Sequence, residues 1–199
     1  VNDEVLKTIG RKHTAQQFFD AFELARKCGF DNINTDLIAG LPTDTSESFK
    51  NSLDSIVRLN AECITVHTLC MKRASRLTTE GVTLDLQQAR DAREMLAYTQ
   101  NILGQNEYIP YYMYRQSRMV GNLENVGWSK KGFESLYNVY VMDETHTILA
   151  CGSGGVTKLK RNNPDYLERI FNFKYPYEYI DRFDELIQRK SGIMQFYGQ

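Results

Sequence analysis

The stretch that decides the fold is Asn32-Ile-Asn-Thr-Asp-Leu-Ile-Ala-Gly-Leu-Pro42, an apolar run that ends at a glycine and a proline. In a strand, side chains alternate between two faces. One face would carry Ile33, Thr35, Leu37 and Ala39, and the other Asn34, Asp36, Ile38 and Gly40. An apolar face and a mixed face are typical of a parallel strand that is covered by helices outside and lines a barrel lumen inside. Asp36 would lie near the C-terminal end of this strand, where barrel enzymes carry their chemistry.

The carboxylate of Asp36 needs hydrogen-bond partners in such a run, because burying an ionised carboxylate costs several kcal/mol unless donors meet it. Two interpretations stay open. Asp36 either bonds loop amides at the strand end, or it accepts hydrogen bonds from ligand hydroxyls, as acidic residues at strand ends do for ribose.

Helical and strand-like segments alternate around this stretch. Apolar spacing, capping residues and β-branched residues predict a helix over residues 14–28, a helix over 49–57, a strand over 63–71 and a helix from a cap at Thr83 to about Gly104. Consecutive strands joined by helices form right-handed crossovers, so the order predicts βαβ units and an α/β fold.

After Gln105 the alternating helix and strand patterns give way to a segment rich in tyrosine and arginine. We therefore expect two structural parts, one over residues 1–107 and a second over residues 108–199. The second part would hold a hairpin of strands 137–142 and 147–151, a short helix starting at 162–165 and a last helix over 177–190. It begins with tyrosines crowded beside arginines: Tyr108, Tyr111, Tyr112, Tyr114, Arg115 and Arg118. These rings either pack an amphipathic edge, or they bind a flat ligand with several carboxylates, with Tyr112, Arg115 and Arg118 as the substrate-binding candidates.

Composition narrows the class of protein. The chain has 199 residues, 42% of them hydrophobic, and a formal net charge of −1, so no global field attracts nucleic acid or an anionic membrane. Neither a signal segment nor an apolar run of membrane-spanning length is present, so we expect a cytoplasmic protein without nucleic-acid or membrane partners. The cysteines Cys28, Cys63, Cys70 and Cys151 lack ligand spacing, so no metal site is predicted from them.

Three further candidates have a plain structural alternative. Arg11 is either a solvated surface arginine or a residue whose guanidinium group binds a carboxylate through two parallel hydrogen bonds. The run Gly152-Ser-Gly-Gly155 is either a tight turn or a backbone cradle for phosphate, although it lacks dinucleotide and Walker spacing. His67, inside the second predicted strand, is the histidine that merits a test.

Several motifs together resemble one family. Thr35-Asp-Leu-Ile-Ala-Gly-Leu-Pro42, with Ala25-Arg-Lys-Cys-Gly-Phe30 before it and Thr45-Ser-Glu-Ser-Phe49 after it, resembles the radical S-adenosylmethionine (SAM) family of oxygen-independent coproporphyrinogen III oxidases. The similarity runs from about Val5 to Met71, and more loosely to the glycine run. The segments 110–116 and 121–127 are similar to the oxidase-like paralogues.

The resemblance implies a partial (βα) barrel, S-adenosylmethionine and a [4Fe–4S] cluster as cofactors, and oxidative decarboxylation of porphyrinogen propionates to vinyl groups in haem biosynthesis. By position, Arg11 matches the family's contact to the adenosylmethionine carboxylate and Asp36 its acidic cofactor contact. Cys70 and Val156 fall where adenosine-side contacts occur. A tetrapyrrole substrate and an external electron donor are the implied partners.

The chain also departs from the family pattern. The cluster motif C-x-x-x-C-x-x-C does not occur in these 199 residues. We therefore expect the C-terminal half of a radical-SAM barrel with a small appended unit of β-hairpin and helices, inactive by itself. Two other functions stay open: a haem-binding or haem-delivering relative without oxidase activity, and a nucleotide-binding module that uses the glycine run.

Overall fold

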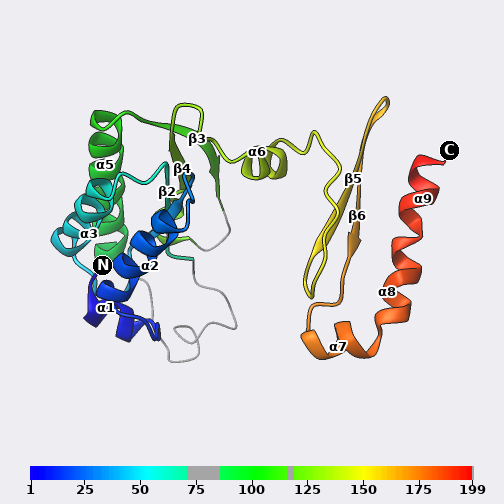
Figure 1. Cartoon of the computed structure of the whole chain (residues 1–199), viewed down its shortest axis with the longest axis horizontal. Helices are drawn as coiled ribbons and strands as arrows, with labels where there is room; N and C mark the ends of the chain where they lie inside the picture. Colours follow the sequence, from blue (N-terminus) through cyan, green and yellow to red (C-terminus); the bar gives the residue numbers. More distant parts are fainter. Residues whose placement is uncertain (71–85, 116–118, 199) are drawn as a thin grey trace. The chain divides into compact units, whose positions relative to one another are not determined.

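The computed structural model describes residues 1–70, 86–115 and 119–198, which form two compact units, Val1–Glu134 and Ser135–Gln199 (Figure 1). The predicted boundary between residues 107 and 108 differs from this division. The strands that follow Glu107 pair with the sheet of the first unit, which moves the boundary to Glu134. The roles predicted for the two parts, half of a barrel and a region near the substrate and cofactor, stay predictions.

The first unit is built on a four-stranded sheet with the order β1-β2-β4-β3. Its elements are α1 (Asp3–Thr8), α2 (Ala15–Lys27), β1 (Asn34–Ala39), α3 (Ser46–Arg58), β2 (Cys63–Thr68), α5 (Leu86–Gln105), β3 (Tyr108–Tyr114), the 3₁₀ turn η1 (Val120–Asn122) and β4 (Asn125–Lys130). Strands β1 and β2 are parallel and joined through α3, as predicted, whereas β4 runs antiparallel to both β2 and β3. The α/β class is confirmed.

Local sequence signals set the ends of the first helices. Thr14 and Gln17 form the predicted capping box of α2, and Thr45 caps α3 by accepting a hydrogen bond from the Ser48 amide. The predicted cap at Thr83 lies outside the described residues.

One face of the sheet forms the core. Alternate residues of β1 are buried as predicted, and α3 and α5 pack against this face (Figure 1). The core side chains come from strands and helices together: Leu37, Ala39, Phe49, Leu53, Ile56, Ile64, Val66, Met95, Leu103, Tyr108 and Trp128. Apolar burial on one face leaves the opposite face free for polar side chains.

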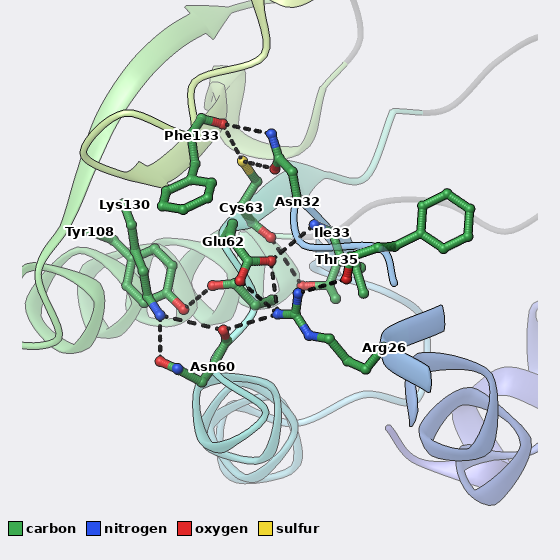
Figure 2. Close-up of polar contacts among 12 residues, drawn as sticks. Arg26, Asn32, Ile33, Thr35, Asn60, Glu62, Cys63, Tyr108, Lys130 and Phe133 are labelled. Atoms are coloured by element: carbon green, nitrogen blue, oxygen red, sulfur yellow. Dashed lines mark hydrogen bonds and ion pairs between the residues drawn. The ribbon is translucent and has the colours of Figure 1, made fainter. Parts of the chain in front are cut away.

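A polar cluster ties together the edge of the sheet at which β1, β2 and β3 begin (Figure 2). Both carboxylate oxygens of Glu62 accept hydrogen bonds from Arg26, at 2.7 and 2.8 Å, and the Ile33 amide also donates to this carboxylate, at 3.0 Å. The buried thiol of Cys63 donates to the carbonyl of Phe133, at 3.0 Å. Because these bonds join α2 to the strands and hold the chain at the end of the first unit, the cluster is structural.

The second unit contains α6 (Leu136–Asp143), a two-stranded antiparallel sheet of β5 (Val156–Asn162) and β6 (Asp165–Phe171), and the helices α7 (Pro176–Asp181), α8 (Phe183–Lys190) and α9 (Gly192–Tyr197). A hairpin is present, but the predicted hairpin over 137–151 is wrong. Residues 137–142 belong to α6, because a short apolar run is compatible with either helix or strand.

The short helix predicted at 162–165 is also wrong. Asn162 pairs with Asp165 across the β5–β6 turn, so the same Asn-Pro-Asp chemistry that favours a helix start here makes a hairpin turn. The last predicted helix is present with a break at Arg182, between α7 and α8.

Candidate functional site

The candidate site lies on the face of the sheet opposite α3 and α5, which we call the polar face. Because side chains alternate along each strand and the strands pair in a fixed register, polar side chains from three strands lie on this face. They are Asn34 and Asp36 of β1, Thr65 and His67 of β2, and Tyr112 and Tyr114 of β3. Thr65 and Tyr112 both pair with Gly127 of β4, which lies between them in the sheet.

Hydrogen bonds run across the polar face from strand to strand. The Asn34 amide donates to Asp36 Oδ1 at 2.7 Å, and the Thr65 hydroxyl donates to Asn34 Oδ1 at 3.0 Å. Thr65 Oγ1 also lies 3.4 Å from the hydroxyl of Tyr112. The tyrosine ring covers Gly127 so closely that a Cβ there would lie 1.8 Å from Tyr112 Cε1. Glycine at this position therefore lets the ring lie flat on the strand.

Asp36 is more open than the sequence suggested. The expectation of a buried carboxylate is wrong, since 60% of its side chain is exposed. In the part of the chain that the structure describes, the outer edge of β1 has no strand partner, which leaves Asp36 in contact with solvent. The interaction with His67 lowers the pKa of Asp36, partial burial raises it by less, and the Asn34 amide lowers it further. The carboxylate is thus ionised and available at neutral pH.

A cavity of about 560 Å³ lies along the open edge of β1 and includes both Arg11 and Asp36 in its lining. Gly10, with φ 77°, turns the chain after α1, and the Arg11 amide donates to the Leu6 carbonyl at 2.8 Å, which fixes Arg11 at the end of that helix. His67 lines the same cavity. The structure therefore brings together the two residues that the resemblance paired, one cationic and one anionic.

The other predicted cofactor contacts are not brought to this cavity. Cys70 is half-buried, forms an isolated β-bridge with Met119 and is not among the residues that line it. Val156 is the first residue of β5, in the second unit, which is described separately from the first. The roles proposed for both residues stay predictions.

The predicted substrate residues divide in a similar way. Tyr112 lies on the polar face, while Arg115 directly follows β3 and forms an ion pair with Glu124. Arg118 lies outside the described residues. The aromatic rings of this segment do pack on one another, with Tyr112 and Tyr114 stacked at 6.3 Å between ring centroids.

The glycine run at 152–155 is a turn whose three glycine amides already have partners. The Gly152 amide donates to the hydroxyl of Tyr179 at 3.2 Å, and the Gly154 amide donates to the Phe173 carbonyl at 2.7 Å. The Gly155 amide donates to the Gly152 carbonyl at 3.3 Å. A phosphate cradle needs amides that point outward, so this geometry favours the tight-turn interpretation.

Sequence reasoning missed most of the polar network. Asn34, Thr65 and Gly127 received no role, Tyr114 was grouped with the tyrosines after Gln105, and His67 was noted without a partner. Alternation along 63–68 places Thr65 and His67 on one face, and this signal could have paired them with Asp36. The antiparallel register of β3 and β4 left no comparable signal.

Neither a metal-binding group nor a membrane-spanning helix is found in residues 1–70, 86–115 and 119–198. No set of three His, Cys, Asp or Glu side chains there is arranged to hold a metal ion. No helix among these residues combines the length and the apolar character needed to cross a membrane.

Comparison with known proteins agrees with the resemblance seen in the sequence. Residues 1–56 match the model of the radical SAM superfamily. The oxygen-independent coproporphyrinogen-III oxidase-like protein HemZ of Bacillus subtilis is 37% identical over 193 residues, which cover 97% of this chain and 38% of the relative. The heme chaperone HemW of Lactococcus lactis is 32% identical over 171 residues, which cover 81% of this chain and 41% of the relative.

A solved structure confirms the fold. Coproporphyrinogen III oxidase (HemN) from Escherichia coli, described as a radical SAM enzyme, matches with a TM-score of 0.64 at 19% identity, over 92% of this chain and 41% of that one. The chain thus spans about two fifths of the length of these relatives.

Proposed function

Because residues 1–56 match the model of the radical SAM superfamily and nearly the whole chain is similar to the coproporphyrinogen-III oxidase-like protein HemZ, we propose that this chain binds S-adenosylmethionine for a radical SAM oxidoreductase. One observation carries the proposal: Arg11 and Asp36 line the same cavity. The guanidinium group of Arg11 suits the ligand's carboxylate, and the ionised Asp36 suits the ribose hydroxyls.

The chain's own contribution is to bind and orient this ligand. A [4Fe–4S] cluster would supply the electron for reductive cleavage of S-adenosylmethionine. The described residues offer no set of thiolate ligands that fits such a cluster. Arg11 and Asp36 instead hold the two ends of a ligand that carries a carboxylate and a diol.

The reaction that we propose for the complete enzyme is oxidative decarboxylation of coproporphyrinogen III. A propionate side chain would lose one hydrogen atom to the 5′-deoxyadenosyl group released from S-adenosylmethionine, one electron to an external acceptor, and carbon dioxide, and would so become a vinyl group. An external electron donor would start the cycle. Tyr112, Arg115 and Arg118 are the residues that we propose for the tetrapyrrole substrate, because aromatic faces and guanidinium groups suit a flat ligand with several carboxylates.

Haem binding without oxidase activity is a second candidate, because the heme chaperone HemW is also a relative. Product analysis separates the two functions. Formation of a vinyl-bearing porphyrinogen by the protein carrying its cluster supports the oxidase. Stoichiometric haem binding without turnover supports the carrier.

Calorimetry with S-adenosylmethionine tests the binding proposal on the 199-residue chain. Arg11→Ala and Asp36→Asn should each weaken binding by about tenfold or more, because a hydrogen bond to a charged group contributes roughly 1.5–3 kcal/mol. Arg58→Ala is the matched control, since Arg58 is on α3, donates to Ser55 and does not line the cavity. Equal affinity in all variants, or no binding by the unaltered chain, would refute the proposal.

A further inference from the structure

His67 lies between two residues of the polar face. Its Nε2 is 3.8 Å from Asp36 Oδ2, and its Nδ1 is 3.5 Å from the hydroxyl of Tyr114. The imidazole and phenol rings meet edge to face, with centroids 6.5 Å apart and planes at 70°. The imidazole is 28% exposed and lines the cavity that includes Asp36. One side chain thus connects the carboxylate on β1 to the tyrosine on β3.

The partners on each side fix which nitrogen of a neutral ring carries the proton. A lone pair on Nε2 would face the ionised oxygen of Asp36 across 3.8 Å, so in a neutral ring this nitrogen carries the hydrogen and directs it toward Asp36. Nδ1 is then the acceptor, and it can receive the hydroxyl hydrogen of Tyr114. Donors therefore run in one direction across the sheet, from Tyr114 to His67 to Asp36. The contact between Tyr114 and Nδ1 is at the outer limit of a hydrogen bond, and the contact between Nε2 and Asp36 is within ion-pair distance.

This arrangement limits how Asp36 can meet a ligand. A carboxylate accepts about four hydrogen bonds, roughly two on each oxygen. The Asn34 amide occupies one position on Oδ1, and His67 faces Oδ2. The Thr65 hydroxyl also interacts with this carboxylate, but its one hydrogen is donated to Asn34 Oδ1. One further position therefore remains on each oxygen of Asp36, which suits two neighbouring hydroxyl groups that each donate one hydrogen bond.

We propose that His67 is a positioning residue that holds the Asp36 carboxylate in the orientation needed to accept a vicinal diol, and so makes this site selective for ribose over deoxyribose. The inference rests on the proposed function to the extent that the diol is the ribose of S-adenosylmethionine. It goes further by assigning the selectivity to His67 and its link to Tyr114. The role is one of positioning, because His67 acts on the ligand through Asp36.

Two nucleosides test the selectivity. Titration of the chain with adenosine and with 2′-deoxyadenosine, followed by NMR, gives the ratio of their dissociation constants. We expect the unaltered chain to prefer adenosine by about tenfold, since one charged hydrogen bond is lost with the 2′-hydroxyl. His67→Ala should reduce this preference to about twofold or less.

A conservative variant separates positioning from folding. His67→Gln places an amide N–H donor near the position of Nε2, so it should restore most of the preference, whereas a loss caused by misfolding would not be rescued. His146→Ala, in the second unit, is the control and should leave the ratio unchanged. A ratio that His67→Ala does not alter would overturn the inference while leaving the binding proposal intact.

The link itself can be tested without ligand. The chain has three histidines, so their ring ¹⁵N signals can be assigned by substitution. We expect His67 to carry its hydrogen on Nε2, and we expect Asp36→Asn and Tyr114→Phe each to shift its ring nitrogen signals. A hydrogen on Nδ1, or signals that neither substitution moves, would overturn the inference. His67-dependent preference for adenosine without binding of S-adenosylmethionine would overturn the proposed function alone. Binding of S-adenosylmethionine without any preference for adenosine would overturn the inference alone, and absence of binding by S-adenosylmethionine and by both nucleosides would overturn both.

Discussion

Gly127 should be intolerant of any side chain as long as Tyr112 is present. The Cβ introduced by Gly127→Ala would lie 1.8, 2.3 and 2.6 Å from three ring atoms of Tyr112. Carbon atoms in contact are normally about 3.5–4.0 Å apart, so the ring has to move by roughly 1.5–2 Å. That movement takes the tyrosine hydroxyl away from Thr65 and uncovers the strand.

The expected cost is about 1–3 kcal/mol in the free energy of unfolding, the usual range for overpacking. The sign should reverse when the ring is removed. In a Tyr112→Ala background, Gly127→Ala should stabilise the chain by about 0.5–1 kcal/mol, because glycine inside a strand loses more backbone entropy than alanine. The backbone of Gly127 does not have a positive φ, so alanine is compatible with it.

Urea unfolding followed by the fluorescence of Trp128, the single tryptophan, measures these changes in the first unit. Gly104→Ala is the control, because a Cβ at Gly104 on α5 meets no atom within 4 Å and alanine favours a helix. A similar loss of stability in both Tyr112 backgrounds, or no loss in either, would refute the packing argument.

Three further predictions concern the structural cluster of Figure 2 and its cysteine. Arg26→Ala should lower the free energy of unfolding by about 2 kcal/mol, because the Glu62 side chain is 12% exposed and loses its cationic partner. This value lies between those of exposed and buried ion pairs. A loss below about 0.5 kcal/mol, measured by urea unfolding, would contradict the prediction. Burial raises the pKa of Glu62, but the hydrogen bonds from Arg26 and the backbone together lower it by more, so the pKa in the folded chain lies below its usual value. The pair of Arg26 and Glu62 therefore stabilises the fold above pH about 4.5, and this contribution is lost as the pH falls further. The acid-induced loss of stability should therefore be smaller in Arg26→Ala, and an unchanged pH profile would count against the assignment. Burial raises the pKa of the Cys63 thiol to about 11. In the folded chain, iodoacetamide at pH about 8 should therefore label the exposed Cys151 and spare Cys63, as measured by peptide mass spectrometry. Rapid labelling of Cys63 would contradict this prediction and would show that the cluster opens.

Sequence periodicity predicted those helices and strands whose structure depends mainly on residues close in the sequence. Caps and apolar spacing predicted α2 and α3, and alternation predicted which residues of β1 face the core, because these patterns depend on neighbours in sequence. The same reasoning failed for residues 137–142 and 162–165. A short apolar run or an Asn-Pro-Asp turn fits two local structures, and the pairing of β5 with β6 chooses between them.

The sequence by itself determined an α/β chain with a carboxylate at the end of its first strand, together with a resemblance that paired Asp36 with Arg11. Tertiary structure decided that both residues line one cavity, that Asp36 is open to solvent, and that His67 stands between Asp36 and Tyr114. The physical reason is that register is a long-range property. Residues 36, 67 and 114 meet because β1 and β2 pair in parallel and β4 carries β3 back alongside them, and no local pattern specifies that pairing.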